Sequence, residues 1–391
     1  MEGGLHQNQS EQTRTLLESM RRLVEKHHSD WHTLPPAAYN SDDIFELERI
    51  KIFRPGWICV GRADQVSRPG DFLSVDVVGE PLVMVRDATG QLRVLSRVCR
   101  HRWMEVCSGG GNSKFFRCPY HGWTYDLQGA LVRAPEMDHT PGFDPKRIQL
   151  PEVRHEVWQG FVYVNLNGCA KPLETRLSAV DEVIAEYELP TWKTVRTIDW
   201  GDSPWDWKVM QDNGDCYHHI ALHATTVEPV YPARSSGNLA SNGWYTVVYA
   251  QAQRLQDDID GQPIQPILFP SKRGLTDFQR THFIIIYVLP NYMIFLQPDM
   301  GVLARVFPIR AGLIRLFMDI FVPPEALAHP RFEELLKAAE ELVRTVHLED
   351  IVACASVQRG LQSALSEPGP LSHLEGHNRS FAHWVARRLT E

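Results

Sequence analysis

The chain of 391 residues has few cysteines, no surplus of basic residues and no long apolar run. Its seven cysteines are too few for a disulfide scaffold, and an odd number cannot all pair within one chain. With 40 Lys and Arg against 48 Asp and Glu, the formal net charge is −8. This disfavours a general nucleic-acid binder, because such proteins need a basic surface to neutralise phosphates. The longest apolar run, residues 283–296, is broken by Pro290 and is shorter than the roughly 20 residues of a membrane helix.

Nucleotide-binding and signal motifs are also missing. The sequence has no G-x-G-x-x-G segment after a predicted strand, no P-loop and no plant-type ferredoxin cysteine run. We therefore predict that the chain does not take a hydride from NAD(P)H by itself. Residues 1–14 are polar and do not resemble a signal peptide, so we expect a cytoplasmic protein with neither membrane nor nucleic acid as partner.

The order of predicted elements indicates an α+β protein of more than one domain. Residues 57–167 hold short alternating or apolar runs separated by Gly, Pro, Asp and Asn, which is typical of a small antiparallel β domain. Beyond residue 170 the patterns predict a central antiparallel sheet flanked by helices. The predicted helices span 173–188, 206–223 and 330–359, and the predicted strands span 244–252, 281–289, 292–296, 301–308 and 312–321. The predicted division is a tail and helix at 1–40, an all-β domain with a helical lead-in at 41–170, and a second domain at 171–391.

Two loops of the predicted β domain each offer one cysteine and one histidine. Cys99 and His101 are followed, sixteen residues later, by Cys118 and His121. Cys and His are ligands of soft and borderline metals, so a tetrahedral zinc site and a Rieske [2Fe–2S] centre both fit. Zinc ribbons usually present a C-x2-C pair from each loop, whereas one Cys and one His per loop lets each loop contact both irons. The spacing therefore favours the Rieske centre, with a zinc-organised binding protein as the alternative.

The residues around these ligands resemble a known family. Cys99–Arg102 fits the pattern C-x-H-R, and Cys118–Trp123 fits C-P-x-H-G-W. Both patterns resemble the Rieske domain of Rieske-type non-haem iron oxygenases, and the resemblance extends over roughly residues 34–384. It implies an N-terminal all-β Rieske domain with a cluster held by Cys99, His101, Cys118 and His121, and a C-terminal catalytic domain.

A second group of candidate ligands lies within residues 206–223, which hold three histidines. Non-haem Fe(II) oxygenases bind iron through two His and one carboxylate, which leaves positions open for O₂ and substrate. Helix geometry alone would pair His219 with His223, four residues apart. The resemblance points instead to the pattern D/E-x-Y-H-x4-H, which implies His218 and His223 as ligands, with His219 as the alternative.

The carboxylates of this second site also follow from the resemblance. Residues 348–361 resemble the family's E-D…V-Q-R-G-L segment, which implies Asp350 as the third ligand and leaves Glu349 as the local alternative. Asp215 lies three residues before His218 and shares its predicted helix face. In the family this acid links a Rieske His of one subunit to the iron His of its neighbour, so the resemblance assigns Asp215 a catalytic role between subunits.

The resemblance implies a terminal oxygenase with one Rieske [2Fe–2S] cluster, one mononuclear Fe(II) and O₂ as co-substrate. Electrons would come from NAD(P)H through a separate flavin and iron–sulfur reductase or a ferredoxin, and the assembly would be a homotrimer. The expected reaction is hydroxylation or oxidative demethylation of a small aromatic or quaternary ammonium substrate. The alternatives are an aromatic-ring cis-dihydroxylating dioxygenase alpha subunit and, more distantly, a Rieske electron-transfer protein without oxygenase activity. We expect the pocket to be lined by Phe278, Phe283, Tyr287, Phe295, Phe307 and Phe317, with Leu222 near the iron.

Overall fold

The computed structural model describes residues 10–25, 31–214 and 220–391. The chain divides into a smaller unit, Arg54–Leu173, and a larger unit formed by Met1–Phe53 and Glu174–Glu391. The helical segment that ends at Phe53 therefore lies in the larger unit, although the sequence prediction grouped residues 41–53 with the β domain. The reason is side-chain packing, because the Phe53 ring lies edge-on to Trp207, with 5.1 Å between ring centroids.

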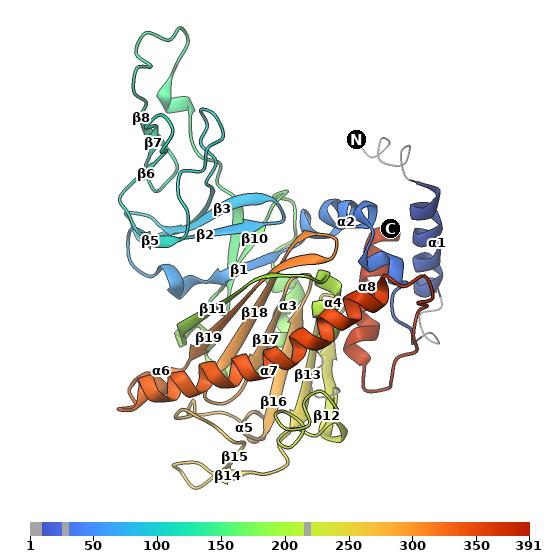
Figure 1. The fold of residues 1–391 in the computed structure, drawn as a ribbon. Coiled ribbons are helices and arrows are strands. Elements are labelled where there is room, and N and C mark those ends of the chain that lie inside the picture. Colours follow the sequence, from blue (N-terminus) through green and yellow to red (C-terminus); the bar gives the residue numbers. More distant parts are fainter. Residues whose placement is uncertain (1–9, 26–30, 215–219) are drawn as a thin grey trace. The chain divides into compact units, whose positions relative to one another are not determined.

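The smaller unit is all-β, as predicted (Figure 1). A four-stranded sheet has the order β4-β3-β2-β5, and two three-stranded sheets have the orders β1-β10-β9 and β6-β7-β8. The strands are β1 (Ile58–Arg62), β2 (Asp71–Val77), β3 (Glu80–Arg86), β4 (Leu92–Ser96), β5 (Gly110–Asn112), β6 (Phe116–Arg117), β7 (Thr124–Tyr125), β8 (Leu131–Arg133), β9 (Arg154–Trp158) and β10 (Phe161–Asn165). This framework positions the two Cys/His loops, which follow β4 and β6.

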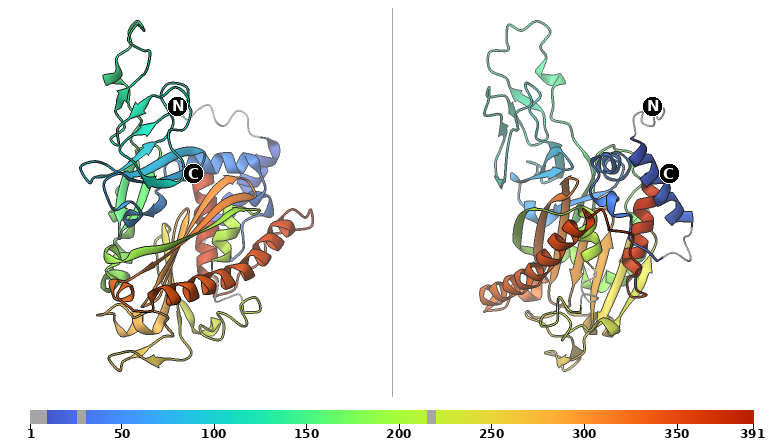
Figure 2. Two further views of the ribbon diagram at one scale, coloured as in Figure 1. Left: turned by 60° about the vertical axis from the view of Figure 1, so that its left-hand side comes forward. Right: turned by 45° about the vertical axis from the view of Figure 1, so that its right-hand side comes forward.

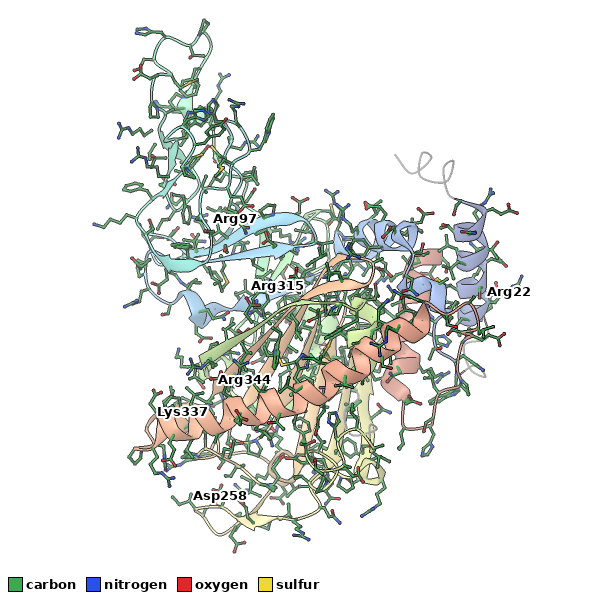
Figure 3. The ribbon with its side chains drawn as sticks, in the orientation of Figure 1. Arg22, Arg97, Asp258, Arg315, Lys337 and Arg344 are labelled. Carbon is green, nitrogen blue, oxygen red and sulfur yellow. The ribbon has the colours of Figure 1, made fainter. Side chains whose placement is uncertain are left out.

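Buried polar side chains fix both ends of β4, the strand that precedes the first Cys/His loop. Asp87, which is fully buried, accepts hydrogen bonds from Thr89 and from Arg93 Nε, the latter at 2.8 Å. Burial opposes ionisation of Asp87, but these donors outweigh burial and hold its pKa well below the usual range. Arg97, which is labelled in Figure 3, lies two residues before Cys99. It donates to Asp76 Oδ1 at 2.8 Å and to Glu105 Oε2 at 3.0 Å. These contacts attach the start of the first Cys/His loop to its own sheet.

The larger unit contains a seven-stranded antiparallel sheet with the order β11-β19-β18-β17-β16-β13-β12. Its strands are β11 (Lys193–Ser203), β12 (Ser236–Ser241), β13 (Tyr245–Gln251), β16 (His282–Val288), β17 (Tyr292–Leu296), β18 (Gly301–Arg310) and β19 (Leu313–Val322), beside the small hairpin β14 (Gln256–Asp257) and β15 (Pro263–Ile264). The helices are α1 (Glu11–Glu25), α2 (Asp42–Glu48), α3 (Glu174–Ile184), α4 (Trp207–Asn213), α5 (Asp277–Thr281), α6 (Pro324–Leu327), α7 (Phe332–Leu361) and α8 (Gly376–Thr390). The five predicted strands of this sheet are confirmed. Among the described helices, none is long and apolar enough to cross a membrane.

One face of this sheet carries the apolar side chains that later form a cavity. The antiparallel register places Phe295 opposite Val302, and Met318 opposite Ala304, so Phe295, Val302 and Met318 project from the same face. Helix α7 lies across the strands in Figures 1 and 2. Its periodicity predicted residues 330–359, which agrees with the observed helix within two residues.

The prediction of one helix over residues 206–223 is only partly correct. Helix α4 begins after Asp206, whose side chain accepts from Lys208 N, and it ends at Asn213. Residues 220–230 form turns rather than helix. Gly214 follows α4 where the backbone packs directly on the sheet, because a Cβ there would come within 2.6 Å of the Tyr287 ring.

Candidate functional site

The two Cys/His loops have the same backbone construction. Trp103 N donates to Cys99 O and Gly122 N donates to Cys118 O, both at 3.1 Å, and each cysteine N–H donates to a carbonyl of its own loop. Cys99 is 1% exposed and Cys118 is 2% exposed. Burial raises the pKa of the Cys118 thiol, and the neighbouring Cys99 thiol raises it further. The structure therefore brings two cysteines from distant loops together beneath the surface.

The two histidines form a second pair beside the cysteines. The His101 and His121 ring centroids are 4.6 Å apart, and the His101 ring stacks on Trp123 at 4.8 Å. His101 Nδ1 is buried and has no hydrogen-bond partner among the described residues, whereas His121 is exposed. Burial and the nearby His121 lower the pKa of His101, which favours its neutral, ligating form. A buried cysteine pair and an outer histidine pair fit a cluster that has Cys on one iron and His on the other.

Tyr125 is a polar neighbour of the cluster site that the sequence analysis did not identify. Its hydroxyl oxygen lies 3.3 Å from Cys99 Sγ and accepts a hydrogen bond from Arg100 N at 3.0 Å. The hydroxyl proton is therefore free to point at the sulfur. Burial, followed by the contact with Cys99, raises the pKa of Tyr125, so the hydroxyl stays protonated at neutral pH.

His223 and Asp350 meet in the larger unit. His223 is 1% exposed, and its Nε2 lies 3.2 Å from Asp350 Oδ1. Two ligand atoms that are each about 2.1 Å from one metal ion, at about 90° to each other, are separated by about 3.0 Å. The observed distance therefore fits two ligands on one face of a metal ion.

Glu349 contacts the opposite side of the same imidazole. Its Oε2 lies 2.7 Å from His223 Nδ1 and accepts a hydrogen bond from Thr226 Oγ1 at 2.6 Å. Because a carboxylate only accepts, Nδ1 carries the proton, and in the neutral ring the Nε2 lone pair faces Asp350. This arrangement favours Asp350 over Glu349 as the ligand and gives Glu349 the task of orienting His223.

Asp350 remains ionised although it is buried. Burial opposes its ionisation, but contacts with His223, His347 and Asn213 outweigh burial and lower its pKa to about 2. The Asn213 Nδ2 donates to Asp350 Oδ1 at 2.9 Å. Burial lowers the pKa of His223, but Asp350 and Glu349 on either side of the ring outweigh burial and raise it. The two carboxylates therefore favour a positive charge at this site, which a divalent cation would supply.

Three residues of the predicted second site lie outside the described residues. These are Asp215, His218 and the alternative ligand His219. In the described ranges, 10–25, 31–214 and 220–391, no group of three or more His, Cys, Asp or Glu side chains is arranged so that it could hold a metal ion. The pair of His223 and Asp350 supplies two of the three ligands that the sequence analysis assigned to iron. The described residues of the smaller unit likewise show pairs of cysteines and histidines and no group of three. This is expected for a binuclear cluster, because each iron takes only two protein ligands.

A cavity of about 270 Å³ reaches Asp350. Its walls come from α7, from one face of the seven-stranded sheet and from the turns after His223. Phe283 and Phe295 line it, as predicted. The other predicted lining residues do not: Phe278 stacks on His282, Tyr287 stacks on His377, Phe307 packs edge-on to Phe317, and Leu222 lies outside the lining. The strand periodicity identified apolar positions but could not say which face meets α7.

Tyr231 completes the aromatic part of the lining, and sequence reasoning missed it. Its ring stacks on Phe283, with 5.1 Å between centroids. Its hydroxyl donates to the buried Gln265 Oε1 at 2.5 Å and accepts from Gln297 Nε2 at 2.8 Å. These two hydrogen bonds fix the orientation of the ring that the cavity meets.

Two other polar side chains line the cavity. His347 is 2% exposed, and its Nδ1 lies 3.8 Å from Asp350 Oδ2, beyond hydrogen-bond length. Asp299 is 1% exposed and lies in the turn between β17 and β18. The spacing of His347 and Asp350, three residues apart on α7, was a signal in the sequence that both face the same side.

Comparison with known proteins identifies the family of each domain. Residues 56–145 match the Rieske [2Fe-2S] domain family, and residues 189–391, just over half of the chain, match the family described as ring hydroxylating alpha subunit (catalytic domain). The chain belongs to the ring-hydroxylating alpha subunit family. This alpha subunit is the oxygenase component of a multi-component Rieske oxygenase, which requires a reductase partner. It combines a Rieske [2Fe–2S] domain with a catalytic domain that binds mononuclear iron.

Named relatives match the alpha subunit over most of its length. A carnitine monooxygenase oxygenase subunit of Acinetobacter pittii is 29% identical over 342 residues, which is 85% of each chain. The chloroplastic choline monooxygenase of Arabidopsis thaliana is 28% identical over 360 residues, 88% of this chain and 79% of that protein. A solved quaternary ammonium Rieske monooxygenase superposes with a TM-score of 0.78 at 25% identity and covers 92% of this chain and 96% of its own.

Proposed function

We propose that the alpha subunit oxidises a small quaternary ammonium compound with O₂ and with electrons passed from NAD(P)H by its reductase or a ferredoxin. The observation that carries this proposal is the cavity, which presents three aromatic rings and extends to Asp350. Aromatic faces attract cations that have no N–H to donate, and desolvation in a buried cavity strengthens that attraction. The names of the carnitine and choline monooxygenase relatives agree with this substrate class.

We propose the metal centres from the sequence motifs, and the residue pairs that the structure describes in each unit support them. We assign the cluster to Cys99, His101, Cys118 and His121, and the iron to His218, His223 and Asp350. Bound Fe(II) supplies the position at which O₂ is activated. The chain contributes the orientation of His223 through Glu349, a hydrogen bond from Asn213 to Asp350, and an apolar cavity that excludes water from the reacting carbon.

We further propose a cytoplasmic homotrimer in which Asp215 connects the cluster of one subunit to the iron of the next. Helix α7 exposes Leu348 and Val352, which lie four residues apart on one face of the helix, and the exposed fraction of Val352 is 67%. Exposed apolar side chains of this kind are suited to burial against another subunit, and head-to-tail contacts can close into a ring. A mass measurement in solution that gives a single species of three chains supports this proposal, whereas a stable monomer contradicts it.

The function is tested by a single turnover that needs no reductase. The protein is reduced anaerobically, mixed with ¹⁸O₂ in the presence of choline, carnitine or an unsubstituted aromatic hydrocarbon, and the products are analysed by mass spectrometry. We expect a product with one labelled oxygen from a quaternary ammonium compound. A product with two labelled oxygens from the hydrocarbon alone would establish the dioxygenase alternative, which the same aromatic walls would also suit.

A Rieske electron-transfer protein without oxygenase activity would give no labelled product from any substrate. It would nevertheless show the visible bands of the cluster. The experiment therefore separates all three functions in one set of samples.

A further inference from the structure

The cavity of the alpha subunit contains a buried carboxylate that the metal sites do not use. Asp299 Oδ2 accepts hydrogen bonds from Leu268 N at 2.7 Å and from Phe269 N at 2.8 Å. Its other oxygen, Oδ1, is buried and has no hydrogen-bond partner among the described residues. One oxygen thus holds the loop that forms part of the cavity wall. The negative charge of the carboxylate is therefore only partly compensated and can attract a ligand in the cavity.

A carboxylate oxygen that is buried without a partner is costly, so its retention in a cavity wall calls for a ligand. Asp299 lines the same cavity as Tyr231, Phe283 and Phe295. Its charge is felt by Tyr231, whose pKa rises through burial and, further, through Asp299. Aromatic faces and one carboxylate around a common space form the surroundings that a compact organic cation needs.

The charges of the other side chains that line the cavity limit the net charge that a ligand can have. Among the described residues that line the cavity there is no Lys or Arg, and the ionisable side chains besides Asp299 are Tyr231, His347 and Asp350. Because Asp350 is assigned to iron, a carboxylate on the ligand would meet the charge of Asp299 with no Lys or Arg in the described lining to balance it, which disfavours such a ligand.

We propose that Asp299 is the specificity-determining residue that selects a net-cationic substrate over both a neutral and a zwitterionic one. This inference rests on the proposed function, because it assumes a quaternary ammonium substrate. A quaternary nitrogen would lie against the rings of Tyr231 and Phe283, with the negative charge of Asp299 in the cavity wall as its counter-charge. The carbon to be oxidised would then lie toward Asp350, at the other polar part of the lining.

The test compares ligands that differ only in charge, bound to the anaerobic holoenzyme and measured by calorimetry. Choline is compared with its neutral isostere 3,3-dimethylbutan-1-ol, and carnitine methyl ester with carnitine. In each pair we expect the net cation to bind at least about tenfold more tightly. The inference is overturned if carnitine binds as tightly as its ester or the isostere as tightly as choline.

The variant Asp299→Asn removes the charge and keeps one oxygen as acceptor for the Leu268 and Phe269 N–H groups. We expect it to reduce both preferences about tenfold and to leave binding of the neutral isostere unchanged. Asp257→Asn, an exposed residue of β14, makes the same change of net charge outside the cavity and should retain both preferences. Cation binding that is unaffected by Asp299→Asn overturns the role of Asp299 and leaves the proposed function standing. A wild-type protein that binds no cation overturns the proposed function, and this inference with it.

Discussion

His223 Nε2 lies 3.2 Å from Asp350 Oδ1, although 126 residues separate the two in the chain. The contact joins the turns after α4 to the middle of α7. Glu349, the residue next to Asp350, contacts the other imidazole nitrogen of His223. Helix α7 therefore supplies both a candidate ligand and the group that orients its partner, so a shift of this one helix would disturb the whole site.

Replacing His223 should remove the mononuclear iron and leave the cluster in place. In His223→Ala the site loses one of its two described ligands, so iron should fall to the two atoms of the cluster, and oxygenation should fall below detection. Iron and sulfide analysis together with the visible spectrum measures both centres. His373→Ala, which changes an exposed histidine of the same unit, is the matched control and should behave as wild type. Full iron content and oxygenation in His223→Ala would show that the iron lies elsewhere.

Removing the charge of Glu349 should weaken iron binding without abolishing it. Glu349→Gln keeps an oxygen that can accept from His223 Nδ1, but it no longer raises the basicity of the imidazole. We expect the affinity of Glu349→Gln for iron to be about 10- to 100-fold lower, as for other groups that orient a ligand. The affinity of Glu349→Ala should be lowered at least as much. Competition with a chelator measures this. Thr226→Val removes only the hydroxyl that donates to Glu349, so it should lower the affinity for iron less than either Glu349 variant does. If both Glu349 variants hold iron as tightly as wild type, Glu349 does not orient a ligand.

The patterns that were predicted correctly are those that depend on local chemistry. The strands of both units follow from alternation of apolar residues, and α7 follows from its helical period. The two Cys/His loops follow from short motifs in which every residue has a chemical task. Each of these signals is contained in a few neighbouring residues, so no knowledge of the packing is needed to detect it.

The features that were missed depend on tertiary contacts. Helix α8 buries His377, Asn378 and His383 together with apolar residues, so its buried positions mix polar and apolar side chains and give a weak amphipathic signal. Asp299 follows a proline in a turn, where an Asp is ordinarily a solvated turn residue. Only the three-dimensional structure places it in the wall of a cavity. The same is true of Tyr125, whose contact with Cys99 joins strand β7 to the first Cys/His loop, 26 residues earlier in the sequence.

The Tyr125 hydroxyl should raise the reduction potential of the cluster. A donated hydrogen bond stabilises the more negative, reduced state of the sulfur ligand, so Tyr125→Phe should lower the potential. A net hydrogen bond of about 1 kcal/mol corresponds to about 40 mV for one electron. Spectroelectrochemical titration measures the shift. Tyr120→Phe is the matched control, because the Tyr120 ring lies against His121, with 3.8 Å between centroids, and no contact of its hydroxyl with sulfur is seen. Equal potentials in wild type and Tyr125→Phe would rule out this hydrogen bond.

Asp299 should also make the folding stability of the larger unit depend on pH. Burial raises its pKa to about 6 from an ordinary value near 3.8, although the backbone N–H groups of Phe269 and Leu268 oppose the shift. The folded state therefore binds a proton more tightly than the unfolded state. Below about pH 4 Asp299 is protonated in both states, and its contribution to the free energy of unfolding is complete. That contribution declines as the pH rises and is lost above about pH 6, where Asp299 ionises in the folded state as well. A shift of about two pKa units corresponds to about 3 kcal/mol at most.

This loss can be isolated by comparing variants across the same pH range. Tyr231 and Tyr187, whose pKa values are raised by burial and by Asp299, stay neutral between pH 4 and pH 7 and do not contribute. Asp299→Asn cannot ionise, so its unfolding free energy relative to wild type should rise steadily between pH 4 and pH 6 and then level off. Denaturant unfolding at intervals of half a pH unit measures the difference. The unfolding free energy of Asp257→Asn should instead show the same dependence on pH as that of wild type. Parallel curves for Asp299→Asn would mean that Asp299 has an ordinary pKa in the folded protein, and that its carboxylate already has a partner in the cavity.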